Sequence, residues 1–321
     1  MTLSPFATFY AKDGAISRYS QTSPRVEWRL RQKPEVSWRK VCQAMRYVEL
    51  AGGEKVPALG LGTWKMGIGD SDEAAQLRAL RTGIAHGMTL IDTAEMYGDG
   101  RSEQLVAKAI AGQRDKVFVV SKVLPQNASR QGTIKACEAS LKRLKTDVLD
   151  LYLLHWRGSY PLPETFAAFA ELRAAGKIRH CGVSNFDVDD LDALDKLVPR
   201  NGTAANQVMY NLSDRGIEWD LHPKCHKAKI AVMAYCPLGQ GRLINNPGIA
   251  SIAKKHGVTH AAIALAFTLR LPGVISIPKS SHEKRVLENV AAADLVLDEE
   301  DLAKLNKLFP PPSRKSPLAI S

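Results

Sequence analysis

A carboxylate, a phenol, an ammonium and an imidazole stand where apolar segments of this sequence end. Asp92 closes the apolar run LID, and Tyr97 follows five residues later in the stretch LIDTAEMYG. Lys122 and His155 close two later apolar runs. A polar residue that closes one strand can be a simple solubility cap. Because such residues close nearly every apolar run here, we expect these four side chains to form one catalytic site.

The chemistry that suits this set is protonation of a carbonyl oxygen while a hydride reaches its carbon. Tyr97 is the expected acid, although a free tyrosine has a pKa near ~10. The Lys122 ammonium at ~4 Å would supply up to roughly 4 kcal/mol, or about three pKa units, towards a lower value. Asp92 is expected to keep Lys122 charged. His155 is expected to donate to the carbonyl oxygen and to orient it.

None of these side chains can supply a hydride, so a nicotinamide cofactor is required. Later strand ends carry groups that suit it. Ser184, Asn185 and Gln207 can grip a carboxamide, and Tyr235 offers a ring face for stacking. We therefore expect the nicotinamide subsite at these four residues.

The elements that must position these residues follow a regular alternation. The sequence predicts eight strands, at Leu59–Gly62, Met88–Asp92, Val117–Lys122, Val148–His155, Arg179–Val183, Ala205–Met209, Ile230–Tyr235 and Gly273–Ile277. Helices are predicted between and after them, at Ala74–His86, Ser102–Ala111, Thr133–Leu144, Glu164–Ala175, Val188–Leu197, Ala261–Leu269, His282–Ala292 and Asp298–Leu308. Ser102 with Glu103, and Thr133, are the expected capping residues.

This alternation indicates an α/β fold, a (β/α)8 TIM barrel with a C-terminal helix. A β-hairpin is predicted ahead of it, from Tyr47–Leu50 through the turn Ala51-Gly52-Gly53 to Lys55–Leu59. A doubly wound sheet is the alternative, but GTWKMG follows the first strand where that fold usually has GxGxxG. Barrel enzymes do their chemistry at the carboxyl ends of the strands, where the candidate residues stand.

Residues 1–45 differ from the rest, because they lack any helical or strand period. They hold eight of the Lys and Arg residues and three of the Asp and Glu residues, or +5 of the net +11. A disordered extension, a transit-type peptide and sequence upstream of a true start at Met45 all remain open, and we favour an irregular, dispensable extension before a domain at 46–321. The remaining charge is too dilute for a nucleic-acid surface.

Other features bound the function classes. The longest apolar runs fall short of the ~18 residues of a membrane span, and no signal peptide is recognised. Five scattered cysteines without CxxC favour a reducing compartment, so we expect a cytoplasmic protein, and a monomer. The stretch HPKCH (His222, Cys225, His226) could suggest a metal site, but without a second ligand cluster a solvated helix start is the better interpretation, and no metal is expected.

The sequence resembles the aldo-keto reductase family over about Arg46 to Leu308. The motifs that carry the resemblance are GLGTWKMG, LIDTAEMYGDGRSE, VSKV, LDLYLLHW, GKIRHCGVSNF, NQVMYNL, AYCPLGQG and IPKSS. The resemblance implies a catalytic tetrad of Asp92, Tyr97, Lys122 and His155. VSKV, LLHW and SDRGIEWDLHPKC look like the bacterial branch of methylglyoxal-reductase-like and 2,5-diketo-gluconate-reductase-like proteins.

The family roles also imply NADP(H) as the cofactor. The nicotinamide positions match Ser184, Asn185, Gln207 and Tyr235, and the pyrophosphate loop matches Leu238 and Gly239. The group around the 2′-phosphate matches Lys279, Ser280, Ser281 and Arg285, and the adenine contacts match Glu288 and Asn289. Gly62, Thr63, Trp64 and Cys236 complete the expected cofactor-binding set. Two charge-assisted bonds to the phosphate, at ~1.5–3 kcal/mol each, would favour NADPH over NADH by at least about a hundredfold. Lys279 and Arg285 could instead be ordinary surface charges.

Two departures from the family pattern bear on the substrate. Cys236 stands where the family often has Ser, and it is a weaker hydrogen-bond partner. The tail after Phe309 and the segment after His155 are both short. A shallow, open pocket lined by Trp64, Tyr97, His155 and Trp156 would suit small aldehydes and α-dicarbonyls such as methylglyoxal.

Three functions compete at this stage. The first is NADPH-dependent reduction of small aldehydes and ketones to alcohols, with Tyr97 as general acid. The second is a non-catalytic NADP(H)-binding redox-sensor module of the same fold, against which the complete tetrad argues. The third is a barrel lyase or isomerase that uses Lys122 as a Schiff-base amine. A lysine kept charged by Asp92 would be a poor nucleophile, which argues against the third.

Overall fold

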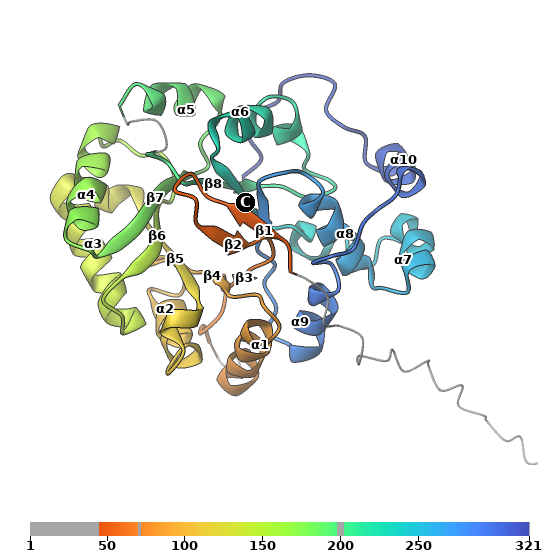
Figure 1. The fold of residues 1–321 in the computed structure, drawn as a ribbon, viewed down its shortest axis with the longest axis horizontal. Helices are drawn as coiled ribbons and strands as arrows, with labels where there is room; N and C mark the ends of the chain where they lie inside the picture. The colour runs from red at the N-terminus through yellow and green to blue at the C-terminus, as the bar shows by residue number, and fades with distance from the viewer. Residues whose placement is uncertain (1–44, 70–71, 198–201, 321) are drawn as a thin grey trace, which may run out of the picture. The chain divides into compact units, whose positions relative to one another are not determined.

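The computed structural model describes residues 45–69, 72–197 and 202–320, and within them a parallel eight-stranded sheet curls into a barrel (Figure 1). Its strands are neighbours in chain order. They are β3 (Leu61–Gly62), β4 (Leu90–Asp92), β5 (Phe118–Val123), β6 (Leu149–Leu154), β7 (Ile178–Ser184), β8 (Ala205–Met209), β9 (Ala231–Tyr235) and β10 (Val274–Ser276). The predicted α/β barrel is confirmed, with strand ends shifted by one or two residues.

The first and last strands meet and close the barrel. Parallel bridges join Leu59 to Ser276 and Gly62 to Lys279, and the Gly62 amide donates to the Pro278 carbonyl at 3.0 Å. A Cβ at Gly62 would lie 2.7 Å from the Ile277 carbonyl oxygen. Only glycine allows so close an approach of two backbones. Barrel closure therefore requires glycine at position 62, independently of the cofactor role expected for Gly62.

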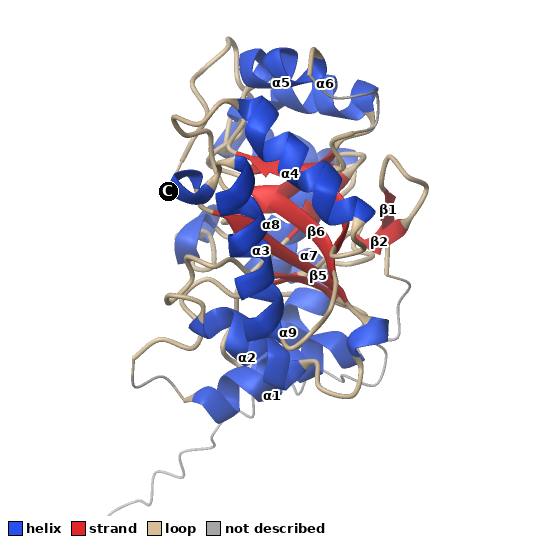
Figure 2. Ribbon diagram, turned by 90° about the vertical axis from the view of Figure 1, so that its left-hand side faces the viewer, coloured by secondary structure: helices blue, strands red, loops and turns tan. Residues whose placement is uncertain are grey.

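Helices surround the barrel strands (Figure 2). They are α1 (Glu73–Ala85), α2 (Arg101–Ala109), α3 (Arg130–Leu144), α4 (Leu162–Ala174), α5 (Val188–Asp195), α6 (Leu221–Ala228), α7 (Ala250–His256), α8 (His260–Leu269), α9 (Glu283–Val290) and α10 (Glu299–Leu308). Every residue of β5 and β6 is buried. Strands covered on both faces have continuous rather than alternating apolar patterns, which is why the runs were visible in the sequence.

The predicted capping residues were wrong for two helices. Helix α2 follows Gly100 and has no side-chain cap, and Ser102 is buried inside it, where its hydroxyl donates to the Met66 carbonyl at 2.6 Å. Helix α3 is capped by Ser129, whose side chain accepts from the Gly132 amide, so Thr133 lies inside the helix. Both helices begin one or more residues before the predicted start.

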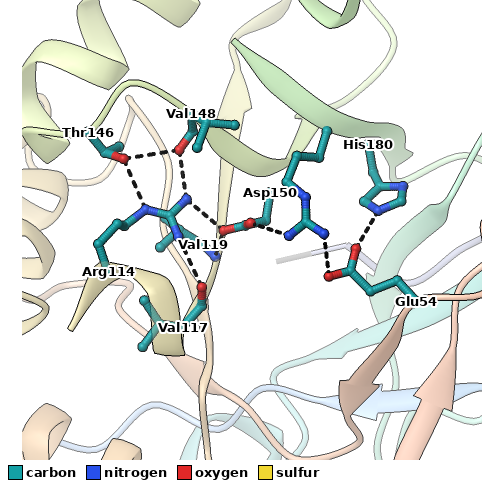
Figure 3. Close-up of polar contacts among 9 residues, drawn as sticks. Glu54, Arg114, Val117, Val119, Thr146, Val148, Asp150 and His180 are labelled. Atoms are coloured by element: carbon teal, nitrogen blue, oxygen red, sulfur yellow. Dashed lines mark hydrogen bonds and ion pairs between the residues drawn. The ribbon is translucent and has the colours of Figure 1, made fainter. Parts of the chain in front are cut away.

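A hairpin of β1 (Tyr47–Glu49) and β2 (Lys55–Pro57) precedes the barrel, as predicted, and pairs in antiparallel register. Glu54, in its turn, accepts hydrogen bonds from Arg179 and from His180, each at 2.7 Å (Figure 3). Both partners lie near the start of β7. The hairpin is therefore bound to the amino ends of the strands, opposite the rim that carries the candidate catalytic residues.

Asp150 belongs to the same polar cluster as Glu54 and His180 (Figure 3). Its carboxylate is 3% exposed and accepts from Arg179 and from Arg114, each at 2.7 Å, and from the Val119 amide at 2.8 Å. A buried carboxylate needs such partners, because burying it unpaired is strongly unfavourable. The cluster thus joins the hairpin to β5, β6 and β7.

Helix α7 was not predicted, and α6 was predicted only as a solvated helix start at HPKCH. HPKCH lies in α6, where His222 and Cys225 are buried rather than solvated, and His222 Nε2 contacts the Pro272 carbonyl oxygen at 2.9 Å. Among the described residues, no three His, Cys, Asp or Glu side chains gather as a metal site would require. No described helix is long and apolar enough to cross a membrane. The extension predicted for 1–45 lies, except for Met45, outside the described residues.

Candidate active site

The carboxyl ends of β4 and β5 bring together three of the predicted catalytic residues. Lys122 Nζ lies 2.8 Å from Asp92 Oδ1 and donates to the Tyr97 hydroxyl oxygen at 3.1 Å. It also donates to the Thr93 carbonyl at 2.8 Å. Lys122 is 0% exposed and Asp92 2% exposed. An ammonium with three partners that is fully withdrawn from water holds a fixed position beside the phenol.

His155, just after β6, stands beside the phenol. Its ring centroid lies 5.9 Å from that of Tyr97, at a steep interplanar angle, and 4.9 Å from that of Trp156. Nδ1 is buried and makes no hydrogen bond within the described residues. Nε2 is the ring nitrogen left for the neighbouring cavity. The tautomer that carries its hydrogen on Nε2 avoids burying an unpaired N–H.

The electrostatic environment of His155 favours the neutral ring. Burial and then the Lys122 charge lower the pKa of His155 to about 3. The imidazole is consequently uncharged at neutral pH and can act as a neutral hydrogen-bond donor, as the orienting role requires.

The expected effect of Lys122 on Tyr97 was wrong. The pKa of Tyr97 is raised well above its ordinary value, first by burial, then by the Asp92 charge and by Cys236 and Tyr235. The predicted pKa of Tyr97 took account of the Lys122 ammonium only. In the structure, the carboxylate that balances the ammonium and the loss of water both oppose ionisation of the phenol. Tyr97 therefore stays protonated at neutral pH, as a proton donor must.

Lys122 itself is affected by burial. Desolvation lowers the pKa of Lys122, and the Asp92 carboxylate opposes that shift through its charge and hydrogen bond, with Glu103 adding to it. Because Asp92 contacts the ammonium through both oxygens, at 2.8 and 2.9 Å, we take the pair as charged. An ammonium in this position can stabilise negative charge on the phenol oxygen, but it does not ionise the phenol beforehand.

The four predicted nicotinamide residues form one hydrogen-bonded group across β7, β8 and β9. The Ser184 hydroxyl donates to the Gln207 carbonyl at 2.9 Å, and the Tyr235 hydroxyl donates to Asn185 Oδ1 at 2.9 Å. Asn185 Nδ2 donates to the His155 carbonyl at 3.2 Å. Asn185 has φ of 58°, in the left-handed region that Asn tolerates better than most residues.

One cavity of about 1170 Å³ runs along this rim. Its size exceeds the ~300–1,000 Å³ usual for small-molecule sites, so it has room for a dinucleotide as well as a small substrate. Most of the predicted residues line it: Gly62, Trp64, Asp92, Tyr97, His155, Trp156, Ser184, Asn185, Gln207, Tyr235, Cys236, Leu238, Lys279, Ser280, Arg285, Glu288 and Asn289.

Four predicted residues, Lys122, Thr63, Ser281 and Gly239, do not line the cavity. Lys122 reaches the site only through Asp92 and Tyr97. The Thr63 hydroxyl donates to the Asp92 carbonyl at 2.9 Å, which fixes the end of β4. Ser281 accepts from Lys279 Nζ at 2.7 Å. Gly239 is buried in the turn after β9, with φ of 56°, where it shapes the loop.

One end of the cavity gathers positive charge. Burial, and then the nearby Lys65 and Arg285 charges, lower the pKa of Lys279. Cations that repel one another at the wall of a cavity are stabilised when an anion joins them. The residues present therefore fit a phosphate group at this end, about where the predicted 2′-phosphate set lies.

Several residues of the cavity wall were not predicted to belong to the site. Lys65, Arg157, Gln240, His260 and Ile320 all line it. Lys65 Nζ lies 4.4 Å from the centroid of the Trp64 ring, and His260 Nε2 is buried without a hydrogen bond to any described residue. Lys65 lies in the stretch GTWKMG after the first predicted strand, where no role was predicted for it. Ile320 gave no sequence signal, because it reaches the cavity from the far end of the chain.

Cys236 lines the cavity in an unusual backbone conformation, with φ of 49°. Its carbonyl accepts from Asn211 Nδ2 at 3.1 Å, and Gln240 Nε2 lies 3.9 Å from its sulfur. The Asn211 side chain, just after β8, thereby holds the loop after β9 through the Cys236 backbone carbonyl, a contact that does not require serine at position 236.

The assembled site has a proton donor held by an ammonium–carboxylate pair, a neutral imidazole donor beside it, and an amide-rich wall across the cavity. This arrangement can orient a carbonyl oxygen, give it a proton and hold an aromatic amide ring nearby.

Comparison with known proteins finds relatives that match most of the chain. The sequence model described as "Aldo/keto reductase family" matches residues 58–309. Methylglyoxal reductase YeaE of Escherichia coli is 48% identical over 278 residues, which cover 85% of this chain and 98% of that protein. Glyoxal reductase of Bacillus subtilis is 36% identical over 261 residues, or 81% of this chain and 92% of that one.

Solved structures show the same relation. The crystal structure of an aldo-keto reductase from Klebsiella pneumoniae in complex with NADPH is 48% identical, with a TM-score of 0.84, over 87% of this chain and 100% of that one. A second Klebsiella pneumoniae structure, in complex with NADP and acetate, is also 48% identical and has a TM-score of 0.83 over the same shares of the two chains.

Proposed function

The chain belongs to the aldo/keto reductase family, and from that premise we propose that it reduces small aldehydes and ketones to alcohols with NADPH. It is an oxidoreductase. Two relatives are named for reducing methylglyoxal and glyoxal, and a structural neighbour was solved with NADPH. The observation that carries the proposal for this chain is the buried contact of Lys122 with both Asp92 and the Tyr97 hydroxyl.

The protein groups divide the work as follows. The nicotinamide, when bound, supplies the hydride. Neutral His155 donates to the substrate oxygen through Nε2 and sets its position. Tyr97 gives its proton to that oxygen. The alkoxide that hydride transfer would form is about as basic as hydroxide, whose conjugate acid, water, has a pKa near ~15.7. Transfer from a phenol is favourable even though burial raises the pKa of Tyr97.

Lys122 and Asp92 act after the proton leaves. Negative charge on the Tyr97 oxygen is stabilised by the ammonium 3.1 Å away. Asp92 keeps that ammonium in place. Reprotonation of Tyr97 from solvent then completes the cycle.

The rest of the cavity holds the cofactor and selects the substrate. Ser184, Asn185 and Gln207 hold the carboxamide, Tyr235 stacks on the ring, and Lys279 with Arg285 binds the 2′-phosphate. Trp64 and Trp156 at the mouth, 38% and 37% exposed, form an apolar wall for a short carbonyl compound such as methylglyoxal. We propose that the enzyme works as a cytoplasmic monomer.

The test is Tyr97→Phe, which keeps the ring and removes the proton. We expect kcat for methylglyoxal reduction to fall by about 10²–10⁴-fold, with the NADPH Kd from fluorescence titration unchanged. Tyr160→Phe is the matched control, because Tyr160 is exposed after β6 and does not line the cavity. A Tyr97→Phe enzyme that turns over at the wild-type rate would refute the acid assignment. Tight NADPH binding by a wild-type protein that reduces no aldehyde would favour the redox-sensor alternative.

A further inference from the structure

Gln207 makes a contact that holding a cofactor amide does not require. Its Nε2 donates to Asp92 Oδ1 at 2.7 Å, and both residues are 2% exposed. Its other contact is with the Met233 sulfur, at 3.9 Å, which is weak. The amide nitrogen of this residue is thus engaged with the catalytic carboxylate.

The bond places Gln207 at one end of a continuous hydrogen-bonded series. Asp92 Oδ1 accepts a hydrogen bond from Gln207 Nε2 and lies within ion-pair distance of Lys122 Nζ. Asp92 Oδ2 accepts a hydrogen bond from Lys122 Nζ. Lys122 in turn donates to the Tyr97 hydroxyl. An amide, a carboxylate, an ammonium and a phenol are therefore connected in that order, from β8 through β4 and β5 to the loop after β4.

The same residue also accepts hydrogen bonds from the end of the neighbouring strand β7. Its backbone carbonyl accepts from the Ser184 hydroxyl and from the Asn185 amide, each at 2.9 Å. Gln207 lines the cavity, and among the described residues no side chain or amide donates to its Oε1. That oxygen remains available to a ligand donor while Nε2 stays on Asp92.

We propose that Gln207 is a positioning residue for proton transfer: its amide fixes the Asp92 carboxylate, and through Lys122 the Tyr97 hydroxyl, while its Oε1 faces the cofactor. The inference rests on the proposed function and adds a coupling to it. A cofactor amide that engages Oε1 sets the plane of the Gln207 amide and so the direction of the bond to Asp92. Seating of the hydride donor is in this way linked to the geometry of the proton donor.

The sign of the electrostatic effect follows from the groups that face Tyr97. These are Lys122 on β5, Asp92 on β4, His155 after β6, and Tyr235 and Cys236 at the end of β9, with Glu103 of α2 acting on Lys122. An amide N–H on Asp92 offsets part of its negative charge. Without it, more of that charge acts on Tyr97, and the phenol ionises at a higher pH.

The experiment compares Gln207→Met, which cannot donate, with Gln207→Glu, which has the same shape. The pH dependence of kcat/KM is measured for aldehyde reduction and for alcohol oxidation. For Gln207→Met we expect the alkaline limb of reduction and the acidic limb of oxidation both to move up, by roughly half to one pH unit. Gln207→Glu should move both limbs further, because at alkaline pH it adds a second carboxylate beside Asp92.

A control separates positioning from cofactor grip. Asn185→Gly removes a neighbouring amide while keeping a residue that accepts φ of 58°. We expect this variant to raise the NADPH Kd and to leave both limbs where they are. NMR of ¹³Cζ-labelled tyrosine follows the ionisation of Tyr97 and gives the same comparison without turnover. The Tyr97→Phe variant assigns the signal. Thermal melting shows that each variant is folded.

The outcomes distinguish the inference from the function on which it rests. Gln207→Met with a weaker NADPH Kd but unmoved limbs, and an unmoved Tyr97 signal, would overturn the positioning role while the acid assignment stands. Wild-type turnover by Tyr97→Phe would instead overturn the proposed mechanism itself. Upward movement in both reaction directions, with Asn185→Gly unmoved, supports the inference.

Discussion

At the scale of single residues, the phenol is governed by its whole surroundings and not by its nearest cation. Lys122 lies 3.1 Å from the Tyr97 oxygen, yet the pKa of Tyr97 is raised, because burial and Asp92 act against ionisation. A protonated phenol suits the reductive direction, in which the site must give a proton. In the mechanism we propose, the ammonium contributes when charge develops on the phenol oxygen, because only stabilisation of the transition state raises the rate.

His155 gives a prediction about pH and stability. Burial and Lys122 lower the pKa of His155 to about 3, whereas an unfolded histidine titrates near ~6.5. Between these values the unfolded chain binds the proton and the folded chain does not, so stability is lost as pH falls below about 6.5. His155→Asn should remove about 1–2 kcal/mol of the loss between pH 7 and pH 5.

Urea denaturation of both proteins at the two pH values measures this difference. His86→Asn, at the exposed end of α1, is the control and should keep the wild-type loss. An unchanged pH dependence in His155→Asn would contradict this prediction, because it would show that the ring binds its proton equally well in the folded and the unfolded chain.

At the scale of elements, the barrel separates its catalytic rim from the end closed by the hairpin. Glu54 joins the hairpin to β7 through Arg179 and His180 (Figure 3), and Asp150 passes the connection to β6. The candidate catalytic residues lie at the other ends of the same parallel strands. Changes to the hairpin should therefore alter local stability and leave the chemistry alone.

Glu54→Gln tests this separation. Loss of the charge weakens both contacts of Glu54, which are partly exposed, so we expect a global stability loss of only about 1 kcal/mol. Hydrogen exchange at the amides of β1 and β2 should quicken, because the hairpin opens more often. The kcat for aldehyde reduction should match that of wild type. Glu49→Gln, in the same hairpin and without an ion pair to any described residue, should change neither measurement, and a large fall in kcat for Glu54→Gln would contradict the separation.

At the scale of the whole molecule, one cavity joins two kinds of surface. At the end beside Tyr97, the Asp92 carboxylate is balanced by Lys122. Its far end carries Lys65, Lys279 and Arg285, whose mutual repulsion contributes to the lowered pKa of Lys279. Positive charge is thus concentrated where the cofactor phosphates are expected. At the other end, we expect substrate recognition to depend on the shape of the cavity and on hydrogen bonds.

Lys279→Met tests this division. A charge-assisted bond to the 2′-phosphate contributes ~1.5–3 kcal/mol, so the NADPH Kd should rise by roughly ten- to a hundredfold while the NADH Kd changes little. Fluorescence titration at low and at moderate salt measures both, and the difference between the cofactors should shrink as salt rises. Lys284→Met, at the exposed second residue of α9, is the control. An equal loss for both cofactors would place Lys279 on a shared part of the dinucleotide.

The sequence by itself determined the barrel, because each buried strand is a local apolar run and each helix a local amphipathic pattern. It also determined which polar residues share one rim, since parallel strands place their carboxyl ends together. Its errors were local as well. Gly100 and Ser129 precede the two helices whose caps were misassigned, and α7, with seven residues, is too short to give a clear period.

Only the tertiary structure decided how the rim residues act on one another. The bond from Gln207 to Asp92 joins residues 115 positions apart, and Ile320 and Lys65 reach one cavity from opposite ends of the domain. The pKa of Tyr97 rises because water is excluded and a carboxylate is near. Burial and the distances between charged groups depend on the entire fold. A periodic sequence pattern can therefore indicate which residues belong to a site, but it cannot predict how their charges affect one another.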